Sequence, residues 1–257
     1  MSARFVRGSL ALHAAALPTL AMFPSRWGWI GGALVANHTA IVAAGLSPRS
    51  SLLGDNLTRD PAAARAGAIA LSFDDGPDPA VTPRVLDLLD AANARATFFC
   101  IGRRVAASPA LAAEIARRGH RVENHTHSHS GSFYFHGRGA LAEEIERCQG
   151  AIAGPTGRAP TLFRAPAGIR SPLLQPALES AGLTLCSWTR RAFDTVRRDP
   201  EAIAAALTRD LTAGDVLVLH DGAAHERAGR AEILLRALPI VLGSIRERGL
   251  AVVPVTG

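Results

Sequence analysis

Short apolar runs alternate with helix-like segments from Gly67 to the carboxyl terminus, and this alternation restricts the fold more than any other feature of the chain. Runs of roughly four to eight apolar residues between turn residues indicate buried strands, whereas apolar residues spaced three and four apart indicate helices. Strands that are joined by helices pair in parallel through right-handed crossovers. About seven such strands predict an α/β fold whose parallel sheet is either closed into a barrel or doubly wound.

The same patterns assign approximate bounds to the elements. The predicted strands cover residues 68–73, 96–101, 120–124, 160–164, 183–188, 215–220 and 250–254. The predicted helices cover residues 82–93, 109–118, 140–151, 172–181, 200–211 and 229–248. Residues 67–257 thus form one domain, and the 48% apolar content of the chain supplies ample material for its core.

Chemically reactive side chains follow the ends of several predicted strands. They are Asp74 and Asp75 after the first strand, Asn124 and His125 at the third, Arg164 at the fourth, and His220 with Asp221 at the sixth. In parallel α/β folds the carboxyl ends of the strands open onto one face. We therefore expect these side chains, which are far apart in the chain, to converge on a single mouth.

Asp74 and Asp75 are adjacent carboxylates at the end of a buried strand. Two neighbouring carboxylates repel each other and are costly to desolvate, so this placement favours a nearby cation. One carboxylate can hold a metal ion while the other, kept charged beside it, serves as a general base. The alternative is an ordinary strand-end turn, with Asp78 capping the next helix.

Three histidines alternate between His125 and His129. Residues four apart share one face of a helix or a tight turn, so His125 and His129 can hold one ion while His127 points elsewhere. With Asp75 they make an Asp-His-His set with open coordination positions, which suits zinc or a similar divalent ion. A solvated histidine-rich loop is the alternative.

Four motifs occur in order along the domain. They are Ser72-Phe73-Asp74-Asp75-Gly76-Pro77, Asn124-His125-Thr126-His127-Ser128-His129, Phe163-Arg164-Ala165-Pro166-Ala167-Gly168 and Leu217-Val218-Leu219-His220-Asp221. Together they resemble the motifs of the polysaccharide deacetylases, and more specifically the chitooligosaccharide deacetylase homology domain of carbohydrate esterase family 4. The resemblance covers Gly67 to the carboxyl terminus. It implies a distorted (β/α)7-type barrel with parallel strands.

The resemblance also implies a reaction, namely metal-dependent hydrolysis of an N-acetyl group on an amino-sugar polysaccharide, oligosaccharide or lipid-linked saccharide. By this resemblance Asp75, His125 and His129 are the metal ligands. The implied cofactor is a divalent metal ion, with zinc favoured over cobalt or manganese.

Five further residues receive roles from the same resemblance. Asp74 is the catalytic base, and Arg164 pairs with it and keeps it ionised. His220 is the acid that protonates the departing amine, while Asp194 orients it and raises its pKa. The backbone N–H of Ala167 helps to bind the oxyanion.

Two positions depart from the family's pattern. Ala167 stands where an aromatic residue normally follows the Arg-x-Pro of the third motif, and Thr195 stands where a tryptophan normally follows Asp194. An alanine keeps the backbone N–H, but both replacements remove bulky walls of a sugar groove, so we expect an altered substrate shape. The aromatic residues 133–135 follow the histidine motif, and we interpret this loop as a lid or a substrate platform.

The first fifty residues differ from the rest in their pattern of apolar residues. One apolar run ends near Phe23, and a second, residues 27–46, carries no formal charge over about the length that crosses a bilayer. We interpret residues 1–48 as apolar helices that anchor the protein in a bacterial-type inner membrane, and residues 49–66 as a linker. A signal peptide and two ordinary helices packed on the domain are the alternatives. The distribution of arginines leaves the side of the membrane open.

The charge of the chain does not indicate a nucleic-acid partner. All of its 28 basic residues are arginines, and they are scattered rather than gathered into a stripe with interleaved aromatics, despite a formal net charge of +6. The three cysteines have no paired spacing, so no disulfide framework is predicted.

We expect a monomer whose partners are an N-acetylated saccharide and the membrane. The alternatives are a deformylase or cyclic-amide hydrolase on the same fold, and a non-catalytic carbohydrate-binding protein. The presence of both Asp74 and His220 argues against a non-catalytic binder.

Overall fold

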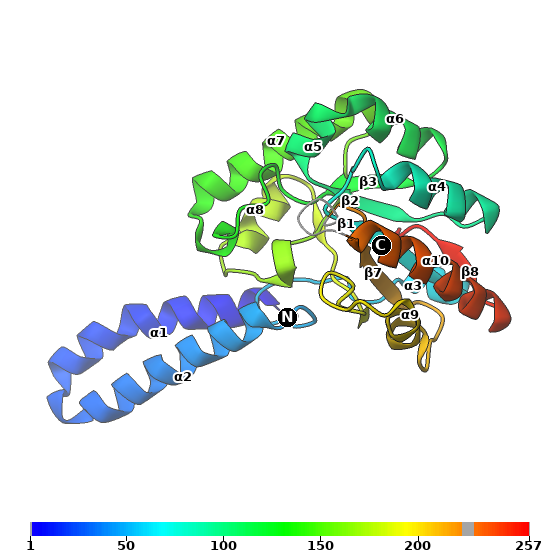
Figure 1. Cartoon of the computed structure of the whole chain (residues 1–257). Coiled ribbons are helices and arrows are strands. Elements are labelled where there is room, and N and C mark those ends of the chain that lie inside the picture. Colours follow the sequence, from blue (N-terminus) through cyan, green and yellow to red (C-terminus); the bar gives the residue numbers. More distant parts are fainter. Residues whose placement is uncertain (1, 223–228, 257) are drawn as a thin grey trace.

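The computed structural model describes residues 2–222 and 229–256, which form a projecting helical hairpin and one α/β domain (Figure 1). The strands of the domain are β1 (Ala68–Asp74), β2 (Thr97–Cys100), β3 (Arg121–Asn124), β4 (Leu162–Phe163), β5 (Thr184–Leu185), β6 (Arg190–Arg191), β7 (Val216–His220) and β8 (Ala251–Val253). Within these residues the sheet has eight strands in the order β5-β4-β3-β2-β1-β7-β6, and β8 pairs with β1. Every ladder between these strands is parallel, as expected.

All seven predicted strands are present, but their lengths depend on their neighbours. β4 and β5 contain only two residues each, because their ladders are short where the sheet reaches its edge. β6 was not predicted, since Arg190 and Arg191 form no apolar run and become a strand only by pairing with β7.

Helices connect the strands and cover the outside of the curled sheet (Figure 1). They are α3 (Pro61–Arg65), α4 (Thr82–Ala91), α5 (Gly102–Ala107), α6 (Pro109–Arg117), α7 (Arg138–Thr156), α8 (Leu174–Ser180), α9 (Pro200–Thr208) and α10 (Arg230–Glu247), with the 3-10 helices η2 (Phe133–Phe135) and η3 (Pro166–Gly168). Two of the starts follow a common pattern, in which a capping aspartate precedes a proline: Asp60 caps α3 and Asp199 caps α9. The short helix α5 was not predicted.

The alternation of side chains along β1 decides which residues reach the interior. Ile69, Leu71 and Phe73 belong to the large apolar cluster that includes side chains of α4, α9 and α10. Ala70 belongs instead to an inner cluster within the curled sheet. Because successive side chains of a strand point to opposite faces, the polar end of β1 delivers Asp74 to the inner face.

β7 follows the same rule. Leu217 and Leu219 pack outward with the helices, whereas Val216 and Val218 belong to the inner cluster. His220 continues the inner series, and it lies opposite Asp74 in the ladder between β1 and β7. The two strands therefore place a carboxylate and an imidazole at the same end of the interior.

Residues 57–59 cross the gap at which the barrel is not closed by strand ladders. Leu57 forms a parallel bridge with Cys186, just after β5, and Arg59 forms an antiparallel bridge with Asp215, just before β7. The N–H of Leu57 donates to the carbonyl oxygen of Leu185 at 2.9 Å. The result is a distorted, incompletely closed parallel α/β barrel, which confirms the predicted fold class.

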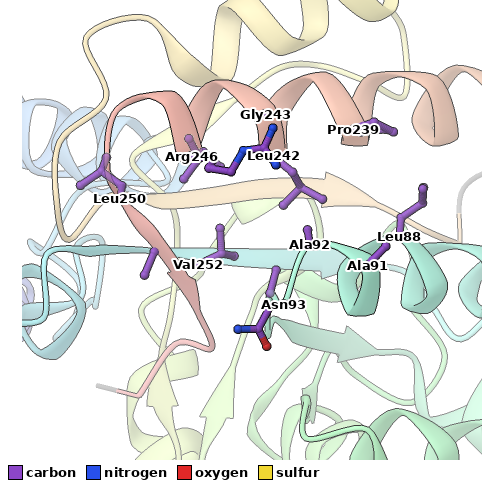
Figure 2. Close-up of a pocket in the computed structure, with 13 residues that line it drawn as sticks. Leu88, Ala91, Ala92, Asn93, Pro239, Leu242, Gly243, Arg246, Leu250 and Val252 are labelled. Atoms are coloured by element: carbon purple, nitrogen blue, oxygen red, sulfur yellow. The ribbon is translucent and has the colours of Figure 1, made fainter.

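A large cavity lies at the amino-terminal end of the strands, between α4, α10 and β8 (Figure 2). Its walls are mainly aliphatic, and Asn93 and Arg246 are its polar side chains. No carboxylate or imidazole lines it among the described residues, so it offers no acid–base chemistry. The reactive groups lie at the other end of the barrel.

The amino-terminal hairpin consists of α1 (Ser2–Met22), the 3-10 turn η1 (Pro24–Arg26) and α2 (Trp27–Leu46), and it projects away from the barrel (Figure 1). Both helices are long and apolar enough to cross a membrane by length and composition. Polar side chains of the two helices face each other, since Asn37 donates to Ser9 at 2.9 Å and the rings of His13 and His38 lie 5.0 Å apart.

Candidate active site

Side chains from several strand ends line one cavity at the carboxyl end of the barrel. They include Asp74 at the end of β1 and Asp75 directly after it, His125 and His129 after β3, Ala167 in η3, and His220 at the end of β7. Of the residues expected at a single mouth, the structure brings Asp74, Asp75, His125 and His220 together there. Arg164 contacts Asp74 but does not line the cavity, Asn124 donates to the carbonyl oxygen of Ile145, and Asp221 accepts from the hydroxyl of Thr82.

Three of them form a compact donor set. Oδ1 of Asp75 lies 3.3 Å from Nε2 of His125 and 3.2 Å from Nε2 of His129. One ligand atom from each of the three residues lies within 4.8 Å of the others. His127 is not part of this set; its Nδ1 lies against Gly102 at the start of α5.

Neighbouring groups orient the two imidazoles. Nδ1 of His125 lies 2.8 Å from the carbonyl oxygen of Arg164, and because a carbonyl only accepts, Nδ1 carries the proton and Nε2 keeps its lone pair. His129 is placed by a tight turn rather than a helix, since its N–H donates to the hydroxyl of Thr126 and both residues have positive φ. Burial lowers the pKa of His129, which favours the neutral, ligating imidazole.

The donor set fits a divalent cation. Oδ1 of Asp75 is buried and has no hydrogen-bond donor among the described residues, although it faces two imidazole nitrogens. Burial by itself raises the pKa of Asp75, but the contact with His125 and the charge of His220 lower it overall. A carboxylate with two neutral imidazoles is a donor set that suits zinc and similar ions.

Asp74 points to a different partner, the fully buried Arg164. Nη1 of Arg164 donates to Oδ1 of Asp74 at 2.6 Å and to the hydroxyl of Ser72 at 2.8 Å. Its Nε and Nη2 donate to the carbonyl oxygens of Cys186 and Ser187. Every part of this buried guanidinium is therefore engaged, which is the condition under which a buried charge is tolerated.

His220 is held by Asp194 through two hydrogen bonds. Its Nδ1 lies 2.9 Å from Oδ1 of Asp194, and its backbone N–H donates to Oδ2 at 2.8 Å. Burial lowers the pKa of His220, but the charge and hydrogen bond of Asp194, together with the charges of Asp74 and Asp75, raise it to about 9. With Nδ1 directed at Asp194, Nε2 is the nitrogen left to face the cavity.

The turn that contains Ala167 completes this side of the cavity. Ala167 has φ 55° and ψ 3°, a left-handed conformation that costs an alanine roughly 1 kcal/mol. Trp188 and the Pro48 side chain both lie where a Cβ on Gly168 would stand, so the turn packs against them without room for a larger residue. Thr195 lines the same cavity.

Two lining residues were missed by the sequence analysis, Trp188 and Arg191. Trp188 is the last residue of a predicted strand, and an aromatic residue at a strand end could have been predicted to line the cavity. Nothing in the sequence indicated that Arg191 lines the cavity, because Arg190-Arg191 is one of several scattered arginine pairs.

The interpretation of residues 133–135 as a lid or platform is wrong for Phe133. Its side chain is 1% exposed and packs in a core cluster, with its ring centroid 5.9 Å from that of Phe163. The ring of Tyr134 contacts that of Phe135 in a tilted arrangement, and none of the three residues lines the cavity. Three consecutive aromatic residues gave no indication of which ring would turn inward.

A parallel α/β barrel with an Asp-His-His donor set and a buried His-Asp pair at the carboxyl ends of its strands is the architecture of a hydrolase. Comparison with known proteins identifies the family. The profile of the family described as polysaccharide deacetylase matches residues 62–186. The chain is 35% identical over 178 residues to a peptidoglycan-N-acetylglucosamine deacetylase of Bacillus cereus. The aligned region covers 66% of this chain and 80% of the relative. It is 31% identical over 190 residues to a chitooligosaccharide deacetylase of Sinorhizobium fredii, covering 72% of this chain and 88% of the relative.

Solved structures agree with this assignment. The fold matches a family 4 carbohydrate esterase from Streptomyces lividans with a TM-score of 0.65 and 32% identity, covering 72% of this chain and 91% of that one. It also matches a peptidoglycan N-acetylglucosamine deacetylase with a TM-score of 0.70 and 26% identity, covering 77% and 90% of the two chains. This chain therefore belongs to the polysaccharide deacetylase family of carbohydrate esterase family 4, and it is a hydrolase of carbon–nitrogen bonds.

Proposed function

We propose that the protein is a metal-dependent deacetylase of an N-acetylated amino-sugar saccharide. The observation that supports this proposal most is the placement of one donor set and two charged pairs, Asp74–Arg164 and His220–Asp194, around a single cavity. Amide hydrolysis needs a base for the attacking water and an acid for the departing nitrogen. The cavity supplies both beside a cation site.

Asp75, His125 and His129 would hold the metal ion, with zinc as the favoured species. When bound, a divalent ion supplies polarisation of the acetyl carbonyl and eases the deprotonation of water.

Asp74 acts as the base. Its carboxylate takes a proton from the attacking water, and the 2.6 Å contact with Arg164 stabilises its negative charge before the proton arrives. Because Arg164 is fixed by Ser72 and by backbone carbonyls, Asp74 is held in one orientation towards the cavity.

His220 acts as the acid. Its Nδ1–H donates to Asp194, so the proton that can be delivered is on Nε2. Transfer of that proton to the amide nitrogen allows the carbon–nitrogen bond to break and the amine to leave. The Ala167 backbone N–H is the proposed donor to the developing oxyanion, since Ala167 lines the same cavity as these residues.

The relatives are named for N-acetylglucosamine in peptidoglycan and for chitooligosaccharide, and we propose an N-acetylglucosamine-containing saccharide as the substrate here. The walls of the cavity differ from the family pattern at Ala167 and Thr195, with Trp188 and Arg191 beside them. These differences favour a substrate of a particular shape rather than any chitin-like polymer.

We also propose that residues 1–48 anchor the domain in a membrane, that residues 49–66 connect the two parts, and that residues 67–257 are the catalytic domain. The hairpin has exposed apolar side chains, including Trp29 at 85% and Leu17 at 77% exposure. Its base is attached near the cavity, because Pro48 contacts the η3 turn and Arg170 donates to the carbonyl oxygens of Ser47 and Ser50. The active site would then lie close to the membrane surface.

The test is product release by the full-length protein in detergent. N-acetylated amino sugars, free and lipid-linked, are incubated with the protein and zinc, cobalt or manganese. We expect acetate and a free amine, and no acetate from the Asp75→Ala variant. Formate release from N-formyl sugars alone would identify a deformylase, and saccharide binding without either product would identify a non-catalytic binder.

A further inference from the structure

We propose that Arg191 binds an anionic oxygen group of the substrate, a phosphate or a carboxylate, beside the N-acetyl group that is removed. This inference rests on the proposed deacetylase function and defines its substrate class as an acidic saccharide.

Arg191 lies in the wall of the active-site cavity. It is the last residue of β6 and pairs with Val218 of β7, two residues before His220. Arg191 lines the same cavity as Asp75, His129 and His220. A group bound by Arg191 would therefore be part of the sugar that carries the reacting acetamide, or of its immediate neighbour.

Two aromatic rings hold the guanidinium in place. Its carbon atom lies 5.3 Å from the ring centroid of Trp188 and 5.0 Å from that of Phe193. Trp188 is buried, and Phe193 stands on the surface with a positive φ. Cation–π contacts of this kind orient an arginine without using its N–H donors.

Arg191 has no anionic partner among the described residues, in contrast to its neighbours. Arg164 contacts Asp74, and Arg190 contacts Asp215 at 3.0 Å. Nε of Arg191 is buried and makes no hydrogen bond to any residue that the structure describes. An unpaired buried donor is costly, and an incoming oxyanion would remove that cost.

The chemistry of the site favours an anion over a neutral hydroxyl. A guanidinium presents a planar fork of donors that matches the oxygens of phosphate and carboxylate. At the two positions where the family usually has aromatic rings, this chain has the smaller side chains of Ala167 and Thr195, and both residues line the cavity together with Arg191. The rim of the cavity thus has less aromatic surface for stacking against a sugar, and it carries the fixed positive charge of Arg191.

The experiment compares three N-acetylhexosamine substrates with the same alkyl chain, using the full-length zinc-loaded protein. One is a neutral glycoside, one carries a glycosyl phosphodiester, and one carries a lactyl carboxylate. We expect kcat/KM for at least one acidic substrate to exceed the neutral value by about 10- to 100-fold, the range of one charged hydrogen-bond pair. The substrate that is preferred distinguishes the phosphate source from the carboxylate source.

Arg191→Gln should reduce that preference about 10- to 100-fold, mainly through KM, and Arg191→Lys should restore part of it. Arg198→Gln is the matched control, because it removes the same charge from an exposed position in the following loop. A wild-type enzyme without any preference, or an Arg191→Gln variant that keeps it, would overturn the inference.

Direct binding separates this inference from the deacetylase proposal. Calorimetric titration of the wild type and of Arg191→Gln with the alkyl phosphodiester and the alkyl carboxylate needs no turnover. Weaker binding to Arg191→Gln supports the inference even if no acetate is released, whereas equal binding contradicts it. Failure to deacetylate all three substrates would count against the proposed function alone.

Discussion

Arg164 and Asp74 form a salt bridge in the centre of the barrel, with 2.6 Å between Nη1 and Oδ1 and with the guanidinium carbon 3.9 Å from the ring centroid of Phe99. Both side chains are almost completely buried. The pair joins the end of β1 to the strand-end loop after β4, so it holds together two parts of the proposed active site.

Removal of one partner should therefore affect stability and catalysis differently. Arg164→Ala leaves an uncompensated carboxylate and frees two backbone carbonyls, and we expect a loss of about 3–5 kcal/mol in the free energy of unfolding. Asp74→Asn keeps an oxygen that can accept from Arg164, so we expect the fold and the metal affinity to remain at lower stability, because the buried guanidinium loses its counter-ion, while turnover falls. Denaturant unfolding and metal titration of both variants test this, and an Asp74→Asn variant with normal turnover would contradict the role of Asp74 as the base.

Asp75→Ala should abolish divalent-metal binding and activity together, because Asp75 contributes the only carboxylate to the three-residue donor set. His125→Ala should have the same effect. His127→Ala serves as the control, since His127 lies outside the set. Equilibrium dialysis with zinc measures the affinity, and stoichiometric zinc retained by Asp75→Ala would exclude the assignment.

Asp194→Asn should change the pH dependence of the rate. His220 is proposed to act in its protonated form, so activity is lost as pH rises through the pKa of His220, which Asp194 helps to raise to about 9. Removing the negative charge lowers that pKa and moves the alkaline fall in rate to lower pH. A profile of kcat/KM against pH measures the shift, with the exposed Asp210→Asn as control. An unchanged alkaline limb would contradict the pairing of the two residues in function.

His120 should make the fold sensitive to acid. Burial, together with the charges of Arg95 and Arg118, lowers the pKa of His120 to about 4, and its Nδ1 accepts a hydrogen bond from the N–H of Ala96. Because the folded-state pKa is below the value of 6.5 for a free imidazole, the associated stability is complete above pH 6.5 and is lost between pH 6.5 and 4. The loss is at most about 3 kcal/mol.

His120→Asn is the matched variant for this prediction, because its side-chain oxygen can accept the same hydrogen bond without titrating. The free energy of unfolding, measured from pH 7 to pH 4, should fall less steeply in the variant than in the wild type. Parallel curves would show that His120 does not titrate in this range.

Deletion of residues 1–43 should release a soluble and active domain, because it removes the exposed apolar helices and keeps the segment that contacts Arg170. Deletion of residues 1–50 removes the carbonyl partners of Arg170 at Gly45, Ser47 and Ser50, and we expect lower stability. Membrane flotation and thermal unfolding of the two deletions test both statements. Aggregation of the shorter deletion would show that the hairpin is part of the domain core.

The connecting segment 49–66 has more structure than its composition indicates. Asp60 is completely buried, accepts hydrogen bonds from the N–H groups of Ala62 and Ala63, and also accepts from Thr256 near the carboxyl terminus. Glycine, proline and asparagine signal a turn, but they carry no information about a bond to a residue almost two hundred positions away.

The sequence by itself was sufficient to predict the class of fold, the family and a set of candidate reactive residues. Apolar periodicity is a local property, and parallel topology brings the ends of such strands to one face whatever the details of packing. This is why Asp75, His125 and His129 could be named as one donor set before any coordinates were known. The same reasoning placed Asp74 and His220 beside it.

Only the tertiary structure decided which neighbours those residues have. The tautomer of His125 depends on the carbonyl of Arg164, the inward turn of Phe133 depends on Phe163, and β6 exists because β7 lies beside it. The environment of Arg191 likewise depends on the tertiary structure, because its contacts with the rings of Trp188 and Phe193 set the position of its guanidinium. Such features are set by contacts between distant parts of the chain, whose energies depend on distance and burial and therefore leave no periodic trace in the order of the amino acids.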